Sequence, residues 1–250
     1  MLILLPPSEG KTAPRHGAPV DVSALAFAPE LTAKRERVLA ALIKVSASKQ
    51  RGRALKALGL SPGLAAELDR NAALLHAPAA PAAEVYTGVL FERLGLPELP
   101  AAARERVLIA SALWGVVRPD DRIPAYRLSI SGRLPRIAGL AGYWRPALAK
   151  ALPDEGLVVD LRSGGYAAAW TPAHATVVGV RGFTEQDGAR KVITHHVKSV
   201  RGDVARALLL APAPARTPED VAEIAVAAGH RVELAHTHAG RHVDVIASST

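Results

Sequence analysis

Apolar and polar positions follow two patterns along the chain. Short continuous apolar runs predict buried strands, and apolar positions that recur at helical spacing predict helices. The predicted strands are Leu2–Leu5, Val107–Leu113, Leu157–Leu161, Val177–Val180, Lys191–Val197 and two short ones around Val232 and Val243–Ile246. The predicted helices are Leu31 to about Ser46, Arg53–Leu58, Pro62 to about Leu75, Pro135–Leu152, about Ser199–Leu210 and Pro218–Ala228. This alternation indicates a mixed α/β, or α+β, fold with a central mixed sheet and flanking helices.

Proline and glycine divide these elements into segments. Pro6 and Pro7 end the first strand, so we expect the following loop, Ser8–Thr12, to lie at its carboxyl end as a candidate site. The Ala- and Pro-rich stretch Ala77–Ala83 is typical of a linker or exposed loop. No internal repeat of fixed period is visible. We therefore expect residues 1–250 to form a single large domain that includes a helical basic segment at about 31–76.

Composition narrows the function classes. The chain has 250 residues, 49% of them hydrophobic, which is enough for a sizeable core. Lys and Arg outnumber Asp and Glu by 31 to 23, so anionic partners are favoured. The absence of cysteine excludes disulfides, thiolate metal sites and a cysteine nucleophile. The short apolar start lacks the pattern of a signal peptide, and no apolar run is long enough for a membrane span, so we expect a cytoplasmic protein without a membrane partner.

The densest run of positive charge lies in the first helical region. Its eight cations are Lys34, Arg35, Arg37, Lys44, Lys49, Arg51, Arg53 and Lys56. The turn Leu58–Ala65 resembles a helix-hairpin-helix DNA-binding element, in which small residues such as Gly63 let backbone N–H groups approach a phosphate. The closely spaced Gly-x-Gly of that element is absent. The alternative is a solvated basic face with an ordinary Gly/Pro turn.

The loop after the first strand carries two partial motifs. Gly10-Lys11-Thr12 is similar to the end of a phosphate-binding P-loop, but Leu5 stands where that motif needs a glycine, and Pro14 disfavours a following helix. Ser8 and Lys11 have the Ser-x-x-Lys spacing of some acyl-transfer enzymes, which also requires a helix to align the pair. Neither motif alone identifies a function.

Histidines form two groups near the carboxyl end. His236 and His238 would lie on one face of a strand with His242 nearby, and His195-His196 is a second pair. Without cysteine or a metalloprotease His-Glu helix, hydrogen-bonded or exposed histidines are favoured over a metal site. We therefore expect neither a metal nor a cofactor.

The stretch Leu113–Leu128 is the most informative one for chemistry. A glycine and two prolines predict a rigid loop after a strand, and this loop carries Arg118, Asp121, Tyr126 and Arg127. Mixed charges on a rigid loop indicate a functional site. The alternative is an Arg–Asp network that only holds the loop in place.

Together with other motifs, this loop identifies a resemblance to a known family. The matching pieces, in order, are Met1–Leu4 with Lys11-Thr12, Val85–Gly88, Gly115–Leu128, Tyr143-Trp144, Val159–Tyr166, and Lys198–Gly202 with Arg206. The Arg-Pro-x-Asp, Pro-x-Tyr-Arg-Leu and Lys-x-x-Arg-Gly pieces in this order are specific. On these motifs the chain resembles the YaaA family of bacterial peroxide-stress proteins over nearly its whole length.

The resemblance implies a cytoplasmic protein with an unusual mixed α/β fold, a basic cleft and a helix-hairpin-helix element. It also implies DNA binding and a role in limiting iron-driven damage under hydrogen peroxide. Two departures are visible. Asp160–Tyr166 replaces the family's Asn-Leu-Ala-Ser-x-Glu-Tyr, so Gly165 stands in place of an acid and Arg162 is gained. Pro7–Gly10 replaces a shorter Ser-Pro-Ala before the shared Lys11.

Two hypotheses follow from these residues. In the first, a cleft binds DNA backbone phosphates with little base readout, and affinity falls steeply with salt. Its candidate contacts are Lys11, Arg118, Arg127, Arg162, Lys198, Arg201 and Arg206, with Lys49, Arg51, Arg53, Lys56 and Gly63 as an outer group. In the second, the protein is an enzyme that acts on a nucleotide, a base or another small anionic ligand. Its candidate catalytic residues are Ser8, Lys11, Tyr86, Asp121, Tyr126, Ser163 and Tyr166.

Overall fold

The structure is a computed structural model that describes residues 1–186, 189–192, 197–237 and 240–248. The strands are β1 (Leu2–Leu5), β2 (Ala80–Pro81), β3 (Val107–Ser111), β4 (Gly115–Val117), β5 (Arg122–Ile123), β6 (Leu157–Asp160), β7 (Thr176–Gln186), β8 (Ala189–Val192), β9 (Arg231–Thr237) and β10 (Gly240–Ser248). Eight of these described strands form one sheet, in the order β4-β3-β1-β6-β7-β10-β9 with β8 paired to β7. The central strands β3, β1, β6, β7 and β10 are parallel, whereas β4, β8 and β9 pair antiparallel.

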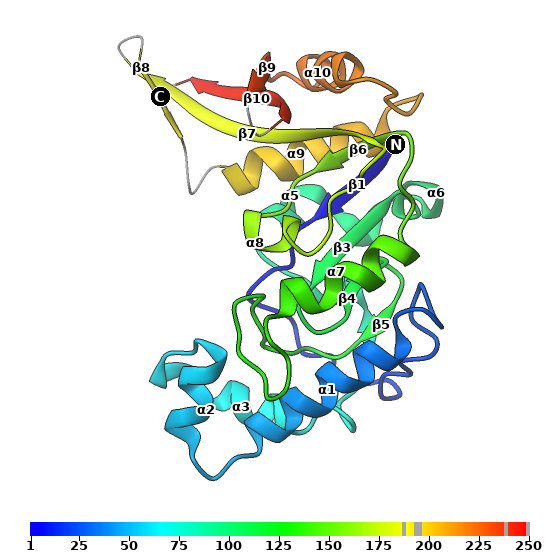
Figure 1. Cartoon of the computed structure of the whole chain (residues 1–250). Helices are drawn as coiled ribbons and strands as arrows, with labels where there is room; N and C mark the ends of the chain where they lie inside the picture. Colours follow the sequence, from blue (N-terminus) through cyan, green and yellow to red (C-terminus); the bar gives the residue numbers. More distant parts are fainter. Residues whose placement is uncertain (187–188, 193–196, 238–239, 249–250) are drawn as a thin grey trace.

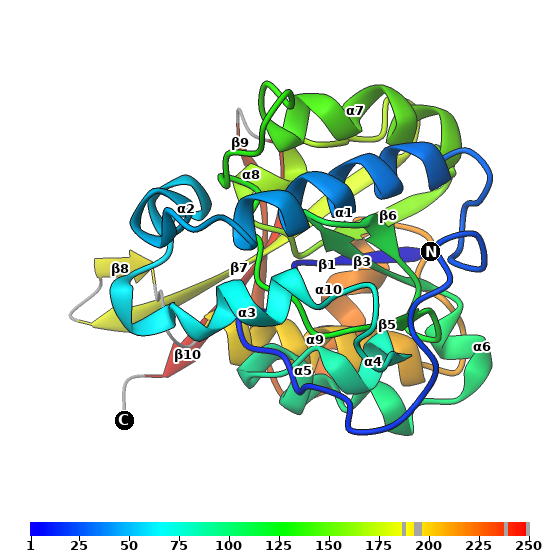
Figure 2. The same ribbon diagram turned by 90° about the horizontal axis from the view of Figure 1, so that it is seen from below.

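Helices cover both faces of this sheet. They are α1 (Thr32–Ser46), α2 (Arg51–Leu58), α3 (Ala66–Ala72), α4 (Ala82–Val85), α5 (Val89–Leu94), α6 (Ala101–Arg104), α7 (Leu140–Ala151), α8 (Gly164–Ala167), α9 (Val197–Leu210) and α10 (Pro218–Ala227). Two 3₁₀ turns, η1 (Pro62–Leu64) and η2 (Leu96–Glu98), complete the list. Figure 2 shows α1 and α7 on one side of the central strands and α5 and α9 on the other. The mixed α/β fold class predicted from the sequence is confirmed.

The central strands β1 and β3 are buried because these parallel strands lie between two helical layers. Ile3 and Leu5 of β1 and every residue of β3 are buried. Helix α9 packs closely against α5 at Gly202, where a Cβ atom would lie 2.5 Å from the Leu90 carbonyl oxygen. The glycine of the Lys-x-x-Arg-Gly motif is therefore needed for this close approach.

Several predicted boundaries were wrong. Ala77–Ala83 is not an exposed linker, because it contains β2 and the start of α4 and completely buries Ala79 and Ala82. The helix predicted from Pro135 begins at Leu140, and the one predicted to reach Leu75 ends at Ala72. The strand predicted at Lys191–Val197 is β8, which ends at Val192; Val197 already belongs to α9, and residues 193–196 lie outside the described part. None of the helices that the structure describes is long and apolar enough to cross a membrane.

The topology places two loops side by side at the carboxyl edge of the sheet. Strand β1 lies between β3 and β6 and is parallel to both, so the loops that leave β1 and β6 emerge at the same edge. The chain continues from β1 toward β3 on one side and from β6 toward β7 on the other. Such a switch point between neighbouring parallel strands is where open α/β sheets bind ligands. Figure 1 shows α2 and α3 at one end of the molecule and α10, β9 and β10 at the other.

Candidate functional site

A cavity of about 700 Å³ lies at this edge of the sheet. Its lining comes from the loops after β1 and β5, the end of α2, the start of α5, α8 and the start of α9. The polar and glycine residues that line it are Ser8, Glu9, Gly10, Lys11, Gly59, Thr87, Gly88, Arg127, Ser129, Ser131, Ser163, Tyr166, Lys198 and Arg201. Residues far apart in the sequence thus surround one concave space.

The loop after β1 reaches the cavity without forming a helix. Pro6 and Pro7 end the strand, and Lys11 forms an isolated antiparallel bridge with Tyr86. The Ser8 hydroxyl accepts a hydrogen bond from the Thr87 amide at 3.1 Å. The Lys11 ammonium donates to the Ser8 carbonyl oxygen at 2.8 Å. The Ser-x-x-Lys pair is therefore joined through the backbone of Ser8 in the described structure.

The Lys11 ammonium lies in the cavity wall above two aromatic rings. Its Nζ atom is 4.3 Å from the ring centre of Tyr126 and 5.2 Å from that of Tyr86. Burial is the main cause that lowers the pKa of Lys11 to about 7. The positive charge of Arg127 also lowers this pKa, whereas the carboxylates of Glu67 and Glu9 raise it. The side chain is therefore close to half protonated near neutral pH.

A chain of hydroxyl groups lies beneath Lys11. The hydroxyls of Tyr86 and Tyr126 are 2.9 Å apart, and Ser111 Oγ lies 2.7 Å from the Tyr126 hydroxyl. Burial is the main cause that raises the pKa of both tyrosines above the usual value of 10. Both tyrosines therefore stay neutral near pH 7 and can donate a hydrogen bond. Ser111, at the end of β3, was not predicted as part of this group.

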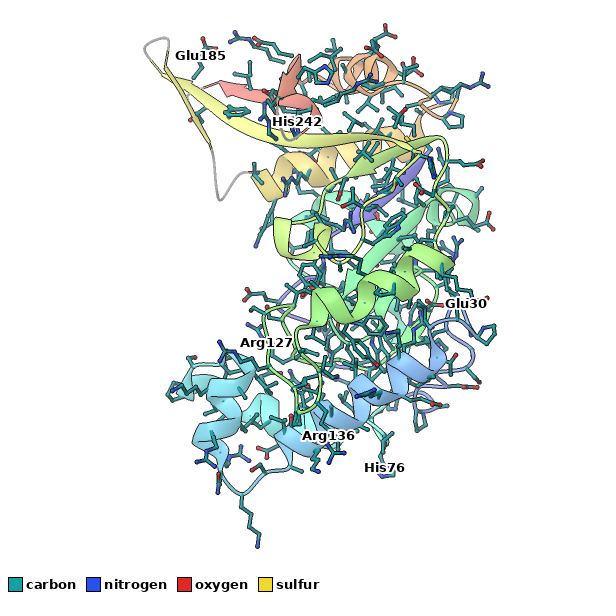
Figure 3. All side chains as sticks on the ribbon, in the orientation of Figure 1. Glu30, His76, Arg127, Arg136, Glu185 and His242 are labelled. Carbon is teal, nitrogen blue, oxygen red and sulfur yellow. The ribbon has the colours of Figure 1, made fainter. Side chains whose placement is uncertain are left out.

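Arg127 enters the cavity from the loop after β5. Its guanidinium group pairs with Glu9 at 2.9 Å, although the Glu9 side chain is 86% exposed. Its backbone is fixed by Asn71, which donates to the Arg127 carbonyl and accepts from the Arg127 amide. In Figure 3, Arg127 lies between the α2–α3 end and the end that carries His242. Asn71 is completely buried on α3, and no feature of the sequence indicated this role.

Another part of the cavity wall carries two more of the predicted cations and two hydroxyl groups. Lys198, at the start of α9, is exposed toward the cavity. Arg201 also lines it, but its guanidinium group donates to the carbonyl oxygens of Val180 and Leu161. Burial lowers the pKa of Arg201 and raises that of Tyr166. Tyr166 and Ser163 complete this wall.

Two predicted residues of the Leu113–Leu128 loop lie elsewhere. The Asp121 carboxylate accepts from the amides of Ala26 and Arg118, both at 2.9 Å, and burial raises its pKa. The Arg118 guanidinium group donates to the Glu105 carbonyl and lies 5.4 Å from the ring centre of Phe27. The Asp121 contacts match the alternative interpretation, in which a charged network holds the loop. The prediction that Arg118 lines the same cleft as Lys11 and Arg127 was therefore wrong.

Two further predicted cations have internal partners. Arg162 pairs with Asp160 at 2.7 Å, and its guanidinium carbon lies 5.7 Å from the ring centre of Trp170. Arg206 donates to the Leu94 carbonyl. A Cβ atom at Gly165 would lie 2.9 Å from Ile130, so the family's glutamate would require Ile130 to shift. The charge gained at position 162 is thus compensated locally.

The basic helical segment is not a uniform cationic face. Arg35 is completely buried and donates to the carbonyl oxygens of Leu25, Ala26, Trp114 and Val116. Burial lowers its pKa to about 10, so it stays charged. The prediction that Arg35 belongs to the exposed cations of this segment was wrong, because its guanidinium group is buried against these four carbonyls.

The outer cations of this segment are exposed. Arg51 forms an ion pair with Asp69 at 2.7 Å, and Arg53 donates to Gln50. Lys49 and Lys56 are also exposed. At Gly63, in η1, no atom lies within 4 Å of a Cβ position. Of this segment, Leu58, Gly59 and Leu60 reach the cavity lining.

The described residues contain no group of three His, Cys, Asp or Glu side chains placed to hold a metal ion. His242 Nε2 lies 3.2 Å from the Thr237 hydroxyl. His195, His196 and His238 fall outside the described residues.

Comparisons with known proteins identify the family of this chain. A family model described as peroxide stress protein YaaA matches residues 1–233. A UPF0246 protein of Streptomyces coelicolor is 43% identical over 243 residues, covering 93% of this chain and 92% of the relative. A UPF0246 protein of Corynebacterium glutamicum strain R is 43% identical, covering 95% and 97%, and one of Salinispora tropica is 32% identical, covering 94% and 90%. The chain therefore belongs to the YaaA family of peroxide stress proteins, whose relatives are named UPF0246.

Proposed function

We propose that this peroxide-stress protein binds DNA along the surface formed by the cavity and the α2–α3 turn. One observation carries the proposal. Lys11, Arg127, Lys198 and Arg201 come from three separate segments, the last two from α9, and line one cavity. Leu58–Leu60 of the α2–α3 turn form part of the same lining. Cations collected in this way are suited to phosphate groups, whose contacts position a protein on DNA without reading bases.

The other predicted cations define the limits of this surface. Arg118, Arg162 and Arg206 lie outside the cavity lining and have internal partners, so they contribute little to phosphate binding. Arg201 lines the cavity, but its donors already bond to two backbone carbonyls. Arg127 and Lys198 remain as the strongest candidates, because one has only an exposed carboxylate partner and the other is exposed. The exposed Lys49, Arg53 and Lys56 provide an outer group next to the turn.

The same binding would account for a role against iron-driven damage. Cationic side chains that contact phosphates displace the counterions held there. A ferrous ion bound at a DNA phosphate would be displaced in the same way, so peroxide would generate fewer radicals at the strand. With ferrous iron and peroxide present, we expect the protein to reduce breaks in plasmid DNA. Equal breakage with and without bound protein would contradict this part of the proposal.

The test of DNA binding compares two double variants of equal charge. We expect Arg127→Ala with Lys198→Ala to lower duplex affinity by about tenfold or more and to reduce the log–log salt slope by about one unit per lost contact. The control is Lys150→Ala with Arg216→Ala, two exposed cations outside the cavity lining. Affinities are measured at about 50 and 200 mM salt. Equal losses in both variants, or an affinity of the parent that does not change with salt, would refute the proposed surface.

A second candidate function is an enzyme that acts on a small anionic ligand in the same cavity. The specific observation in its favour is the pKa of Lys11, which is about 7. Phosphate binding does not require a lowered lysine pKa, whereas nucleophilic or general-base chemistry needs the neutral amine. The concave shape and the hydroxyl of Tyr166, which lines the cavity, fit this function as well. Tyr86 and Tyr126 are buried behind Lys11 and are not among the lining residues. Incubation with nucleotides and sugar phosphates tests it, since product must form with the parent and not with Lys11→Arg.

A further inference from the structure

Lys11 has the environment of a nucleophilic amine. The bridge to Tyr86 and the hydrogen bond from the Thr12 amide to the Val85 carbonyl fix its backbone. Its Nζ atom donates to a carbonyl oxygen and lies against two aromatic rings. Among the described residues, no carboxylate lies within ion-pair distance of this nitrogen. A lysine that only bound phosphate would not need this apolar, partly desolvated position.

Burial is the largest cause that favours the neutral amine of Lys11. Among the nearby charges, Arg127 is the strongest and also opposes protonation, whereas Glu67 and Glu9 favour it. Desolvation next to another cation is a common way to activate a lysine for attack on a carbonyl group. The rings of Tyr86 and Tyr126 lie beside the amine and shield it from water, while their hydroxyls bond to each other and to Ser111.

The cavity that Lys11 lines also contains two candidate anion-binding groups. Lys198 and Arg127 line the same space as Lys11, and they come from α9 and from the loop after β5. A volume of about 700 Å³ accommodates a ligand of nucleotide size. A phosphate bound by these two side chains would leave a neighbouring carbon of the same ligand within the cavity that Lys11 faces.

We infer that Lys11 forms an imine with an aldehyde that carries a phosphate group. The inference rests on the phosphate-binding cavity of the proposed function. The Nζ lone pair attacks the aldehyde carbon, and the C=O bond opens to a hydroxyl group that takes a proton from the nitrogen. Loss of one water molecule then gives the C=N bond. The aldehyde has two sources, a free sugar phosphate or the ring-opened sugar of an abasic position in DNA.

Reductive trapping tests the imine and distinguishes the two sources. The intact protein is incubated with sodium cyanoborohydride and either deoxyribose 5-phosphate or a duplex oligonucleotide containing one abasic position. Borohydride-type reduction converts the imine to a stable secondary amine, which peptide mass spectrometry assigns to a residue. We expect the adduct at Lys11, and at least a tenfold lower yield in Lys11→Arg. Lys44→Arg is the matched control, because Lys44 is an exposed lysine of α1.

Each outcome decides a separate question. An adduct at Lys11 with either compound supports the imine and identifies its source. No adduct with either compound, or adducts spread over surface lysines and unchanged in Lys11→Arg, would overturn it. Affinity for an intact duplex is measured in parallel on the same protein. DNA binding without an adduct refutes only the imine, whereas a sugar phosphate adduct without DNA binding refutes only the proposed DNA function. The thermal midpoint of Lys11→Arg shows whether the variant is folded.

Discussion

Arg35 and Lys11 are both buried cations, but their regions use them differently. Arg35 lies in the basic helical segment and donates to four backbone carbonyls, so its charge is fully compensated by hydrogen bonds. Lys11 lies at the cavity and has one carbonyl acceptor and two aromatic rings. Burial lowers both pKa values, to about 10 for Arg35 and about 7 for Lys11. A compensated buried cation stabilises a fold, whereas a poorly compensated one is available for chemistry.

The same contrast extends to the exposed charges of the two regions. In the helical segment, Arg51 and Asp69 form an exposed ion pair, which contributes little to stability. At the cavity, Arg127 is paired with Glu9, yet its backbone is fixed by buried Asn71. Charge density along the sequence is greatest in the helical segment. The concave cationic site lies instead where loops converge.

The largest expected effect concerns Arg35. Arg35→Met leaves four buried carbonyl oxygens without their donor, and we expect it to lower the free energy of unfolding by about 3–5 kcal/mol. Lys44→Met, at an exposed position of the same helix, should change it by less than about 0.5 kcal/mol. Denaturant unfolding followed by circular dichroism measures both. If the two variants were equally stable, the hydrogen bonds of Arg35 would not stabilise the fold.

The next effect is the pH dependence caused by Lys11. Its folded pKa of about 7 lies below the usual 10.5, so the unfolded state binds more protons between these values. The cost of burying the charge is present in full below pH 7 and disappears as the pH rises. The parent should therefore gain stability from pH 7 to 9, by at most about 1.4 kcal/mol per pH unit. Lys11→Met should remove this gain.

Unfolding curves of both proteins at pH 6, 7, 8 and 9 measure this difference. At pH 6, Lys11→Met should be more stable than the parent. If the free energy of unfolding changed with pH equally in parent and variant, the burial of Lys11 would not destabilise its charged form. The contrast with Arg35 would then be lost.

A smaller effect is expected at the α2–α3 turn. Gly63→Val places its side chain in open space, so stability should change little. If η1 presents backbone N–H groups to a phosphate, the same change should weaken duplex binding several-fold. Neutralising Lys49, Arg51 and Arg53 together should weaken binding to all sequences alike. Electrophoretic mobility shifts at matched salt test both variants, and unchanged affinity in both would leave the cavity as the whole DNA site.

The smallest effect concerns Glu9. Because Glu9 pairs with Arg127 and is almost fully exposed, Glu9→Gln should free the guanidinium group at little cost to the fold. An exposed pair of this kind contributes about 0.2–1 kcal/mol, so duplex or phosphate affinity should rise by a factor of about 1.4 to 5. Asp69→Gln is the matched control, since it frees Arg51 in the helical segment. An equal rise in both variants would remove the difference between the two regions.

The sequence alone determined much of the framework. The apolar run Leu2–Leu5 with its prolines predicted both a buried strand and a loop at its carboxyl end, and Lys11 lies there. Helical periodicity located α1 and α9 to within two residues, because a repeating apolar face is a local property. The family motifs identified Arg127, Lys198 and Tyr166 as site residues, and all three line the cavity.

Only the tertiary structure decided which charges face the cavity. Arg118 and Arg127 belong to one loop, yet one contacts Glu105 and the other pairs with Glu9, 118 positions away in sequence. Arg35 follows Lys34 but is buried, since its position on α1 faces the carbonyls of β4 and the preceding loop. The environment of Lys11 depends on Tyr86 and Tyr126, which packing of the end of α4 against the loop after β5 brings together. Burial and partners come from packing between distant segments, and local sequence patterns contain no information about that packing.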